Sequence, residues 1–461
     1  MEMDEMGEQE VKKRQSKAID MLSGSIFDKL LLFALPLAAS SILQQLFNAV
    51  DVAVVGRFAS SRAQAAVGCV APFVNLLLNI FIGISVGANV VIAKYIGQNI
   101  KDEIRRTVHT AIIVALLSGV FLLGFGQLVA KPVLMWMNTP LDIIEDATLY
   151  LRIYFLGMPF ILLYNFGAAI LRSIGDTKRP FYCLMVAGII NAGLNLFLVI
   201  VFHMGVAGVA IATVVSNMIS SSMVLYLLMH EQSDIKLCLN ELKIWKPELI
   251  QMLKIGLPAG LQTSVFSIAN IFIQSALNGY GSDAVAGSAV IINYEFVTYF
   301  IVSAFGQATV TFTSQNYGAG QYERCKKVFR LALPTCMGII LCVSWGFILG
   351  RDFFIGIFTS EPKVAEYASI RMIHIMALYI LIPTYEIGGA ALRGIGYSMT
   401  PALITIFGTC VLRLVWIYTV CKVYTGFETL INVYPISWGV TGTIVLITYF
   451  IIRKRVFAKA Q

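Results

Sequence analysis

Long apolar blocks, separated by short polar connections, run through almost the whole chain. Residues 63–93, 107–130, 180–202, 255–282 and 429–452 contain no Lys, Arg, Asp or Glu. A helix needs roughly 20 apolar residues to cross about 30 Å of hydrocarbon, and each block is long enough. The pattern therefore predicts an all-α polytopic membrane protein. Its spans are expected near 27–56, 64–94, 107–130, 147–171, 180–202, 205–229, 252–279, 284–316, 331–350, 366–392, 400–421 and 436–452, twelve in all.

The charged residues favour the same class and indicate its orientation. They make up 13% of the chain, against about 25% in soluble domains. If both termini are cytoplasmic, most of the 34 lysines and arginines fall in the termini and the cytoplasmic connections, which is the positive-inside bias. The net charge of +8 therefore reflects orientation in a membrane and not binding of nucleic acid. We expect contact with membrane lipid and none with nucleic acid.

A segment of the fourth span recurs in the tenth. Gly167–Gly175, followed by Pro180, returns as Gly388–Gly396, followed by Pro401. Six spans per copy give both copies the same orientation, so we expect two six-helix bundles related by a pseudo-twofold axis along the membrane normal. The expected domains are a cytoplasmic N-terminal tail (1–26), an N-terminal lobe (27–229), a cytoplasmic linker (230–251), a C-terminal lobe (252–452) and a cytoplasmic C-terminal tail (453–461).

The recurring segment ends in a turn on the cytoplasmic side. Its glycine ends one helix, its proline begins the next, and its arginine falls near a helix C-terminus, where cations are favoured. We interpret the turn as a structural and gating motif in which the arginine anchors the helix end, with direct substrate binding by the arginine as the alternative. The motif comprises Arg172, Gly175 and Pro180 in the first half and Arg393, Gly396 and Pro401 in the second.

The run Leu-Arg-Ser-Ile-Gly-Asp-Thr-Lys-Arg-Pro at 171–180 is the most specific of several motifs. It occurs with Leu-Pro in spans 1 and 7, with Asp51-x-x-x-x-Gly56, and with Asn191-x-x-x-Asn195 followed by the small residues of 205–213. Together with the repeat, these motifs resemble the multidrug and toxic compound extrusion (MATE) family, of the prokaryotic type, from about residue 25 to 455. The resemblance implies a secondary antiporter that expels organic, often cationic compounds in exchange for Na⁺ or H⁺.

Polar residues inside the N-terminal spans are the candidates for the coupling-cation site. Asn191 and Asn195 lie four residues apart and face the same way on span 5. Their counterparts in the second copy are Leu412 and Trp416, which carry no amide group. By resemblance, the positions that line the cation pocket of prokaryotic members are matched by Asp51, Asn165, Asn191, Asn195 and Thr213.

The chemistry of this set fits either coupling ion. Carboxylate, amide and hydroxyl oxygens suit Na⁺, and a desolvated carboxylate can hold a proton. Some relatives have a second acid at the position of Asn195, and its absence here leaves the choice of ion open. The alternatives are that Asn191 and Asn195 only pack helices together, and that Asp51 is a snorkelling residue near the outer interface.

The C-terminal half offers two carboxylates inside spans. Glu295, together with Asn293 and Tyr294, is a candidate for binding substrate or a second cation, with a buried hydrogen-bonded acid as the alternative. Glu386 is also a candidate, and because it lies two turns before Arg393, a structural ion pair is its alternative. We favour the N-terminal pocket for the coupling cation.

Two prolines interrupt the backbone hydrogen bonding of corresponding spans. They are Pro36 in span 1 and Pro258 in span 7. We hypothesise that cation binding or protonation at Asp51 changes the packing of span 1, and so shifts the protein between inward-facing and outward-facing states.

These features together predict a transporter and not an enzyme. The chain has no GxxxxGK[ST] loop for ATP, no HExxH motif and no clustered Cys or His. We therefore expect an ion gradient as the energy source, no cofactor besides Na⁺ or H⁺, and no metal site beyond Na⁺. We expect a monomer in the bacterial plasma (inner) membrane, multi-pass with both termini cytoplasmic, that binds a small organic substrate. The main alternative is a lipid or lipid-linked oligosaccharide flippase of the same superfamily, followed by a membrane enzyme and a channel.

Overall fold

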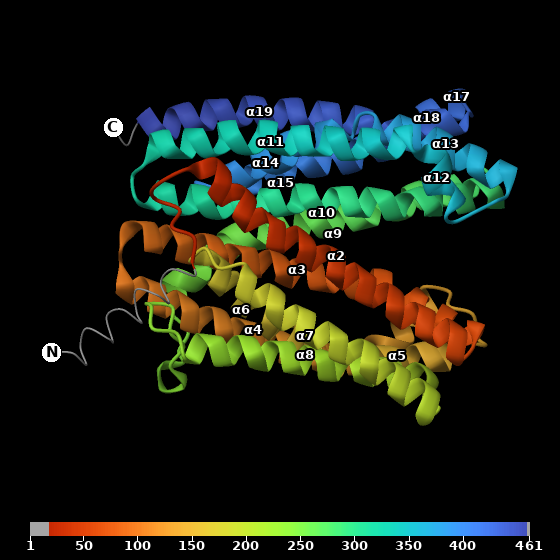
Figure 1. Cartoon of the computed structure of the whole chain (residues 1–461), viewed down its shortest axis with the longest axis horizontal. Coiled ribbons are helices and arrows are strands. Elements are labelled where there is room, and N and C mark those ends of the chain that lie inside the picture. Colours follow the sequence, from red (N-terminus) through yellow and green to blue (C-terminus); the bar gives the residue numbers. More distant parts are fainter. Residues whose placement is uncertain (1–17, 459–461) are drawn as a thin grey trace. The chain divides into compact units, whose positions relative to one another are not determined.

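The computed structural model describes residues 18–458. Residues 1–17 and 459–461, which hold most of the predicted N-terminal tail and the end of the predicted C-terminal tail, lie outside the described residues. Every regular element in the described part of the chain is helical (Figure 1), so the predicted all-α class is confirmed.

The helices of the first half are α2 (Ile26–Phe58), α3 (Ser61–Gln98), α4 (Lys101–Trp136), α5 (Ile144–Leu156), α6 (Met158–Ser173), α7 (Lys178–Leu196), the π-helical η1 (Phe197–Val201) and α8 (Gly205–Met229). A short 3₁₀ turn, η2 (Leu239–Glu241), lies in the linker. The second half contains α9 (Lys246–Asn278), α10 (Ser282–Gly318), α11 (Tyr322–Leu349), α12 (Arg351–Gly356), α13 (Pro362–Met376), η3 (Tyr379–Leu381), α14 (Ile382–Gly394), α15 (Met399–Thr405), η4 (Ile406–Val411), α16 (Leu412–Tyr418), α17 (Val420–Val423), α18 (Phe427–Ile431) and α19 (Val433–Ala458).

The described residues contain enough long apolar helices for the predicted number of spans. Eleven helices or continuous helical segments are long and apolar enough to cross a membrane, and the bent pair α5 and α6 brings the number to twelve. That pair is bent by 46° at Gly157, just before Pro159. In the second half the 3₁₀ turn η3 likewise precedes Pro383. Both breaks fall where proline removes a backbone donor and restricts the residue before it.

The described chain divides into two compact units, and the division crosses two helices. One unit contains the residues up to Asp20 and Ala39–Leu257, and the other contains Met21–Ala38 and the residues from Pro258 onward. The start of α2 therefore belongs with the second half of the chain, and the start of α9 with the first. This exchange was not in the sequence prediction, which gave 27–229 to one lobe and 252–452 to the other.

The repeated segment forms the most buried helix of each unit. In the first unit α6 contacts α3, α4 and α8, and α7 packs against α8. In the second unit α14 contacts α10, α11 and α19. Most side chains of α6 and α14 are buried, because both helices are surrounded by other helices of their own unit.

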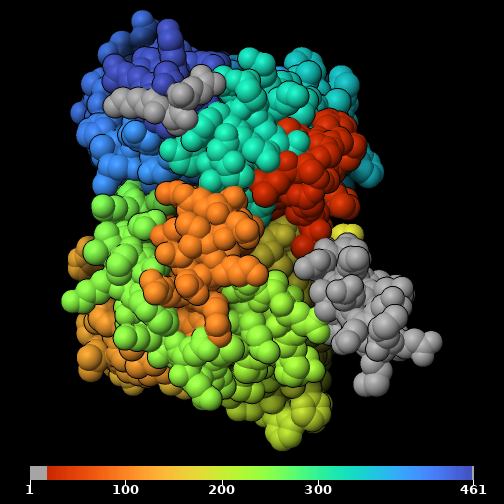
Figure 2. Space-filling model, turned by 90° about the vertical axis from the view of Figure 1, so that its left-hand side faces the viewer, coloured from red at the N-terminus to blue at the C-terminus, as the bar shows by residue number. Residues whose placement is uncertain are grey.

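The linker packs against the start of α4, and Figure 2 shows these two segments next to each other. Arg105 donates a hydrogen bond to Glu241 at 2.7 Å, and the backbone N–H of Trp245 donates to the hydroxyl of Thr110 at 3.1 Å. His109 binds the linker backbone at Cys238 and lies edge-on to the ring of Trp245. The linker is thereby fixed to the first unit.

Candidate functional site

Asp51 is the centre of a polar cluster inside the first unit. Its side chain is buried, with 7% of the residue exposed. One carboxylate oxygen accepts a hydrogen bond from Nδ2 of Asn195, and the other accepts from the Thr213 hydroxyl at 3.3 Å. Nδ2 of Asn195 also lies 3.3 Å from Oδ1 of Asn191. The cluster thus joins α2, α7 and α8, and it brings together four of the five residues predicted to hold the cation.

A glycine on α7 lets α2 come close enough to form this cluster. A Cβ atom built on Gly188 would lie 1.6 Å from the ring of Phe47, so any larger residue there would displace this ring or the helix that carries it. Phe47 is one turn before Asp51 on α2, and Gly188 is nearly one turn before Asn191 on α7. The close approach at this point therefore brings the carboxylate to the two amides.

The cluster has the composition of a site for a hard cation or a proton. Both hydrogen-bond partners of Asp51 in the described structure are neutral. Oδ1 of Asn195 is buried and has no hydrogen-bond partner among the described residues. A carboxylate and amide and hydroxyl oxygens are the ligands that hard cations prefer. The donor set therefore fits Na⁺, and the carboxylate alone fits a proton.

Asn165 is not part of the cluster. Its Nδ2 donates to the carbonyl of Ile161, one turn earlier on α6, at 2.8 Å. Its side chain therefore bonds to its own helix and not to Asp51.

The candidate acids of the second unit have partners of their own. Glu295 accepts two hydrogen bonds from Arg371, at 2.8 and 3.1 Å, and Arg371 is only 2% exposed. Tyr294 donates to the carbonyl of Phe354 at 2.8 Å, and Asn293 donates to the carbonyl of Ala289. Among the candidates of the described chain, Glu295 is therefore the one in a buried ion pair.

Glu386 has a different partner from the one considered in the sequence. The hydroxyl of Tyr299 donates to it at 3.4 Å. Within the described residues no ion pair joins Glu386 to Arg393, and Nε of Arg393 is buried without a hydrogen-bond partner. The ion pair along α14 that the sequence offered as an alternative is therefore not formed here.

Two buried arginines of the second unit were missed in the sequence. Arg371 is the partner of Glu295, and Arg413 is fully buried between α9 and α19. The sequence feature that could have revealed Arg371 and Arg413 is a basic residue inside a predicted apolar span.

Arg413 was also missed because of the register in which the two halves were aligned. An alignment of Gly167 with Gly388 pairs Asn191 with Leu412. An alignment of Pro36 with Pro258 moves the register by one position and pairs Asn191 with Arg413. The second register therefore places a cation opposite a residue of the polar cluster.

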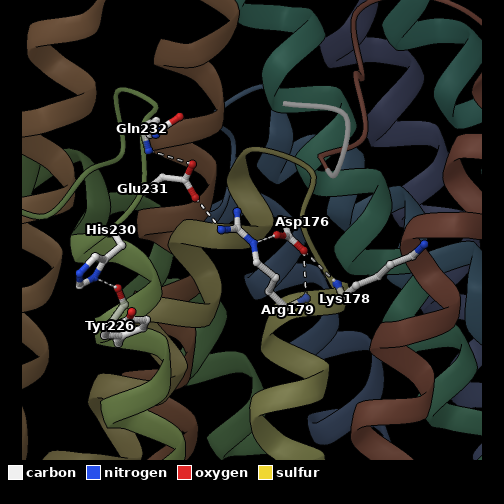
Figure 3. Close-up of polar contacts among 7 residues, drawn as sticks. All are labelled: Asp176, Lys178, Arg179, Tyr226, His230, Glu231 and Gln232. Carbon is white, nitrogen blue, oxygen red and sulfur yellow. Dashed lines mark hydrogen bonds and ion pairs between the residues drawn. The ribbon is translucent and has the colours of Figure 1, made fainter. Parts of the chain in front are cut away.

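The recurring turn has the same backbone in both halves but different side chains. Gly175 and Gly396 have φ of +94° and +93°, a conformation that glycine adopts without strain. In the first half Asp176 accepts the backbone N–H groups of Lys178 and Arg179, and its carboxylate pairs with the Arg179 side chain (Figure 3). The residues at the positions of Asp176 and Arg179 in the second half are Tyr397 and Thr400, which cannot form this ion pair.

The network of the first turn extends to the end of α8. Arg179 also donates to Glu231 at 2.6 Å, as Figure 3 shows. Arg172 donates to the carbonyl of Ala168 in its own helix at 3.1 Å, and Tyr164 donates to the carbonyl of Pro180. These contacts lie within the first unit, and the one with Glu231 ties the turn to the start of the linker.

One other group of described residues has the spacing of metal ligands, namely His109, Cys238 and Glu241. Nδ1 of His109 lies 2.7 Å from the carbonyl of Arg105, and its Nε2 accepts the backbone N–H of Cys238 at 3.1 Å. Arg105 also donates to Glu241. Both ring nitrogens are already bonded and a guanidinium lies beside the carboxylate, so the group holds the linker and is not suited to a metal.

Comparisons with known proteins agree with the duplicated helical fold. The profile of the MatE family matches residues 36–197 and 258–419, once in each half, so that Pro36 corresponds to Pro258. The chain is similar to the probable multidrug resistance protein YoeA of Bacillus subtilis (28% identity, covering 83% of this chain and 84% of YoeA) and to the probable multidrug resistance protein NorM of Thermotoga maritima (28% identity, 86% of each). Its fold is similar to that of a solved MOP superfamily transporter from Pyrococcus furiosus, with a TM-score of 0.88, 22% identity and coverage of 95% of this chain and 98% of the other.

Proposed function

Because the chain belongs to the MatE family of multidrug and toxic compound extrusion transporters, we propose that it is a secondary antiporter that exports small organic cations in exchange for Na⁺ or H⁺. We propose further that the exchange takes place across a bacterial plasma membrane, with both termini in the cytoplasm and the protein acting as a monomer. The names of the relatives, which include several multidrug resistance and export proteins, support drug-like compounds as the substrates.

The observation that supports this function most is the environment of Asp51. A buried carboxylate held only by neutral groups is costly in a membrane, and such residues usually serve ion or proton transfer. Na⁺ or a proton at Asp51 would compensate its charge. An alternating gain and loss of that cation would couple the substrate to the gradient.

The cluster also suggests how the cation affects the helices. Asp51, Asn195 and Thr213 come from three different helices, and the carboxylate now accepts a hydrogen bond at each oxygen. A cation on the carboxylate competes with these two donors, so the packing of α2 against α7 and α8 changes with its charge. Pro36, inside α2, is a point where the helix can bend in response.

The test is transport of ethidium, a cation without an acidic group, into everted membrane vesicles with Na⁺ and pH gradients imposed separately. Wild type is expected to accumulate the dye with one of the two gradients. Asp51→Asn is expected to reduce gradient-driven accumulation to the level of vesicles without the protein. The matched control is Asp142→Asn, which removes an exposed carboxylate and should leave the rate unchanged.

Two results would contradict the proposal. The first is transport by Asp51→Asn at the wild-type rate. The second is a wild type that moves no dye under either gradient but moves a labelled lipid between leaflets, which would favour the flippase.

A further inference from the structure

The second unit holds a cation at the place where the first unit holds its polar cluster. Arg413 is fully buried. Its Nε donates to the hydroxyl of Ser437 at 3.1 Å, and its Nη1 donates to Oδ1 of Asn270 at 3.4 Å. Its Nη2 is buried and has no hydrogen-bond partner among the described residues. The guanidinium is thus only partly satisfied, and only by neutral groups.

The charges around Arg413 do not balance. Arg371 and Arg413 both lie over the ring of Tyr434, at 5.3 and 4.6 Å from its centre. The acid of this group is Glu295, and both of its oxygens are bonded to Arg371. Among the described residues Arg413 makes no ion pair. One positive charge therefore remains uncompensated in a buried position, which is expensive in any protein and more so in a membrane.

A purely structural role explains only part of this arrangement. Arg413 connects α16 with α9 and α19 through Asn270 and Ser437, and the ring of Phe266 lies 5.0 Å from the guanidinium carbon. Glutamine, whose amide reaches about as far as Nε of arginine, could bond to Ser437 and connect α16 with α19 without burying a charge. The Nη2 group without a partner and the unbalanced charge both favour an anionic ligand at this position.

We propose that Arg413 binds a carboxylate or phosphate group of the transported compound, so that the substrates include organic molecules with an acidic group. The inference rests on the proposed export function and adds compounds with an acidic group to its proposed substrates. Guanidinium is the side chain best suited to planar oxyanions, because two of its N–H groups can bind two oxygens at once. The rings of Phe266 and Tyr434 lie against the guanidinium, so an oxyanion bound there would have aromatic neighbours.

The test uses two dyes that differ in one group. Rhodamine 110 has a free carboxylate, and rhodamine 123 is its methyl ester and a simple cation. We expect purified wild-type protein to bind rhodamine 110 more tightly, as measured by fluorescence anisotropy. Arg413→Gln should weaken rhodamine 110 binding by at least about tenfold and leave rhodamine 123 binding within about twofold. Arg413→Lys keeps the positive charge but loses the paired N–H groups of the guanidinium, so it should weaken rhodamine 110 binding less than Arg413→Gln does.

A matched control variant and the comparison of the two dyes on wild type keep the result from depending on whether Arg413→Gln folds. Arg351→Gln removes a partly exposed arginine of the same unit and should change neither affinity. If wild type binds both dyes equally, the proposal is wrong whatever the variants do. It is also wrong if Arg413→Gln loses affinity for both dyes to the same extent. If both dyes bind alike, and chloride or inorganic phosphate stabilises wild type but not Arg413→Gln, the site binds only small anions and the proposal is wrong as well.

The outcomes also separate this inference from the proposed function. Vesicles that export ethidium while the protein does not distinguish the two rhodamines would overturn only the anion site. Everted vesicles that accumulate none of the three dyes would overturn the export function itself.

Discussion

The two units share a scaffold but differ in the charge of their polar clusters. In the first, Asp51 is held by Asn195 and Thr213, both neutral. In the second, when the repeat is aligned as the family profile aligns it, Arg413 takes the place of Asn191 and Ile273 takes the place of Asp51. The positions that shape the backbone, such as the turn glycines, are the same in both. The two halves therefore share the positions that determine helix geometry, while their buried polar clusters carry opposite charges.

The largest expected effect comes from breaking the ion pair of the second unit. Glu295→Gln leaves Arg371 buried without its acid, which should destabilise the protein by about 3–5 kcal/mol. The measurement is the thermal unfolding temperature in detergent. Glu145→Gln breaks an ion pair with Lys131 whose side chains are largely exposed, so it should have little effect. Equal effects of the two substitutions would show that the pair in the second unit is not a buried charge pair.

The next effect sharpens the comparison by opening the cluster of the first unit alone. Gly188→Ala places a methyl group against Phe47 and should cost about 1–3 kcal/mol, with a matching loss of gradient-driven ethidium transport because α2 moves away from α7. Gly193→Ala is the control on the same helix, since nothing lies within 4 Å of a Cβ there. If Gly188→Ala transports as well as Gly193→Ala, the close approach of α2 is not needed for coupling.

The smallest effect compares the two turns. Gly396→Ala forces alanine into positive φ and should cost about 1 kcal/mol. Gly175→Ala should cost more, because its Cβ would also lie 2.4 Å from the carbonyl of Ile19, whereas nothing lies within 4 Å at Gly396. Thermal unfolding of both variants, each against wild type, measures the difference. A larger loss for Gly396→Ala would contradict the predicted order.

The spans, the duplication and the turn could be predicted from the sequence because each depends on local pattern. Apolar length predicts a span, and glycine followed by proline predicts a turn. The meeting of Asp51 with Asn195 and Thr213 was predicted by resemblance and not by pattern, since the contact depends on how α2 approaches α7. Asn165 matched the same set, yet its amide bonds to the backbone of its own helix, which no residue spacing reveals.

The buried arginines show where sequence reasoning ended. Arg371 is far from Glu295 along the chain, and only tertiary packing brings the two together. Arg413 was overlooked because a shift of one position in the alignment of the two halves pairs Asn191 with Leu412 instead of Arg413. The exchange of the starts of α2 and α9 between units could not be found either, since an apolar helix gives no sign of which neighbours it will contact.

That exchange has a consequence for how the protein is made. Met21–Ala38 is synthesised before α3, but the unit it belongs to also contains α19. The first unit in turn needs the start of α9, up to Leu257, which extends past the end of the predicted linker. If the gene were cut in the linker and the two fragments produced separately, each would lack a piece of its own bundle and hold a piece of the other. We therefore expect neither fragment to fold alone, and we expect the second unit to be complete only after α19 has entered the bilayer.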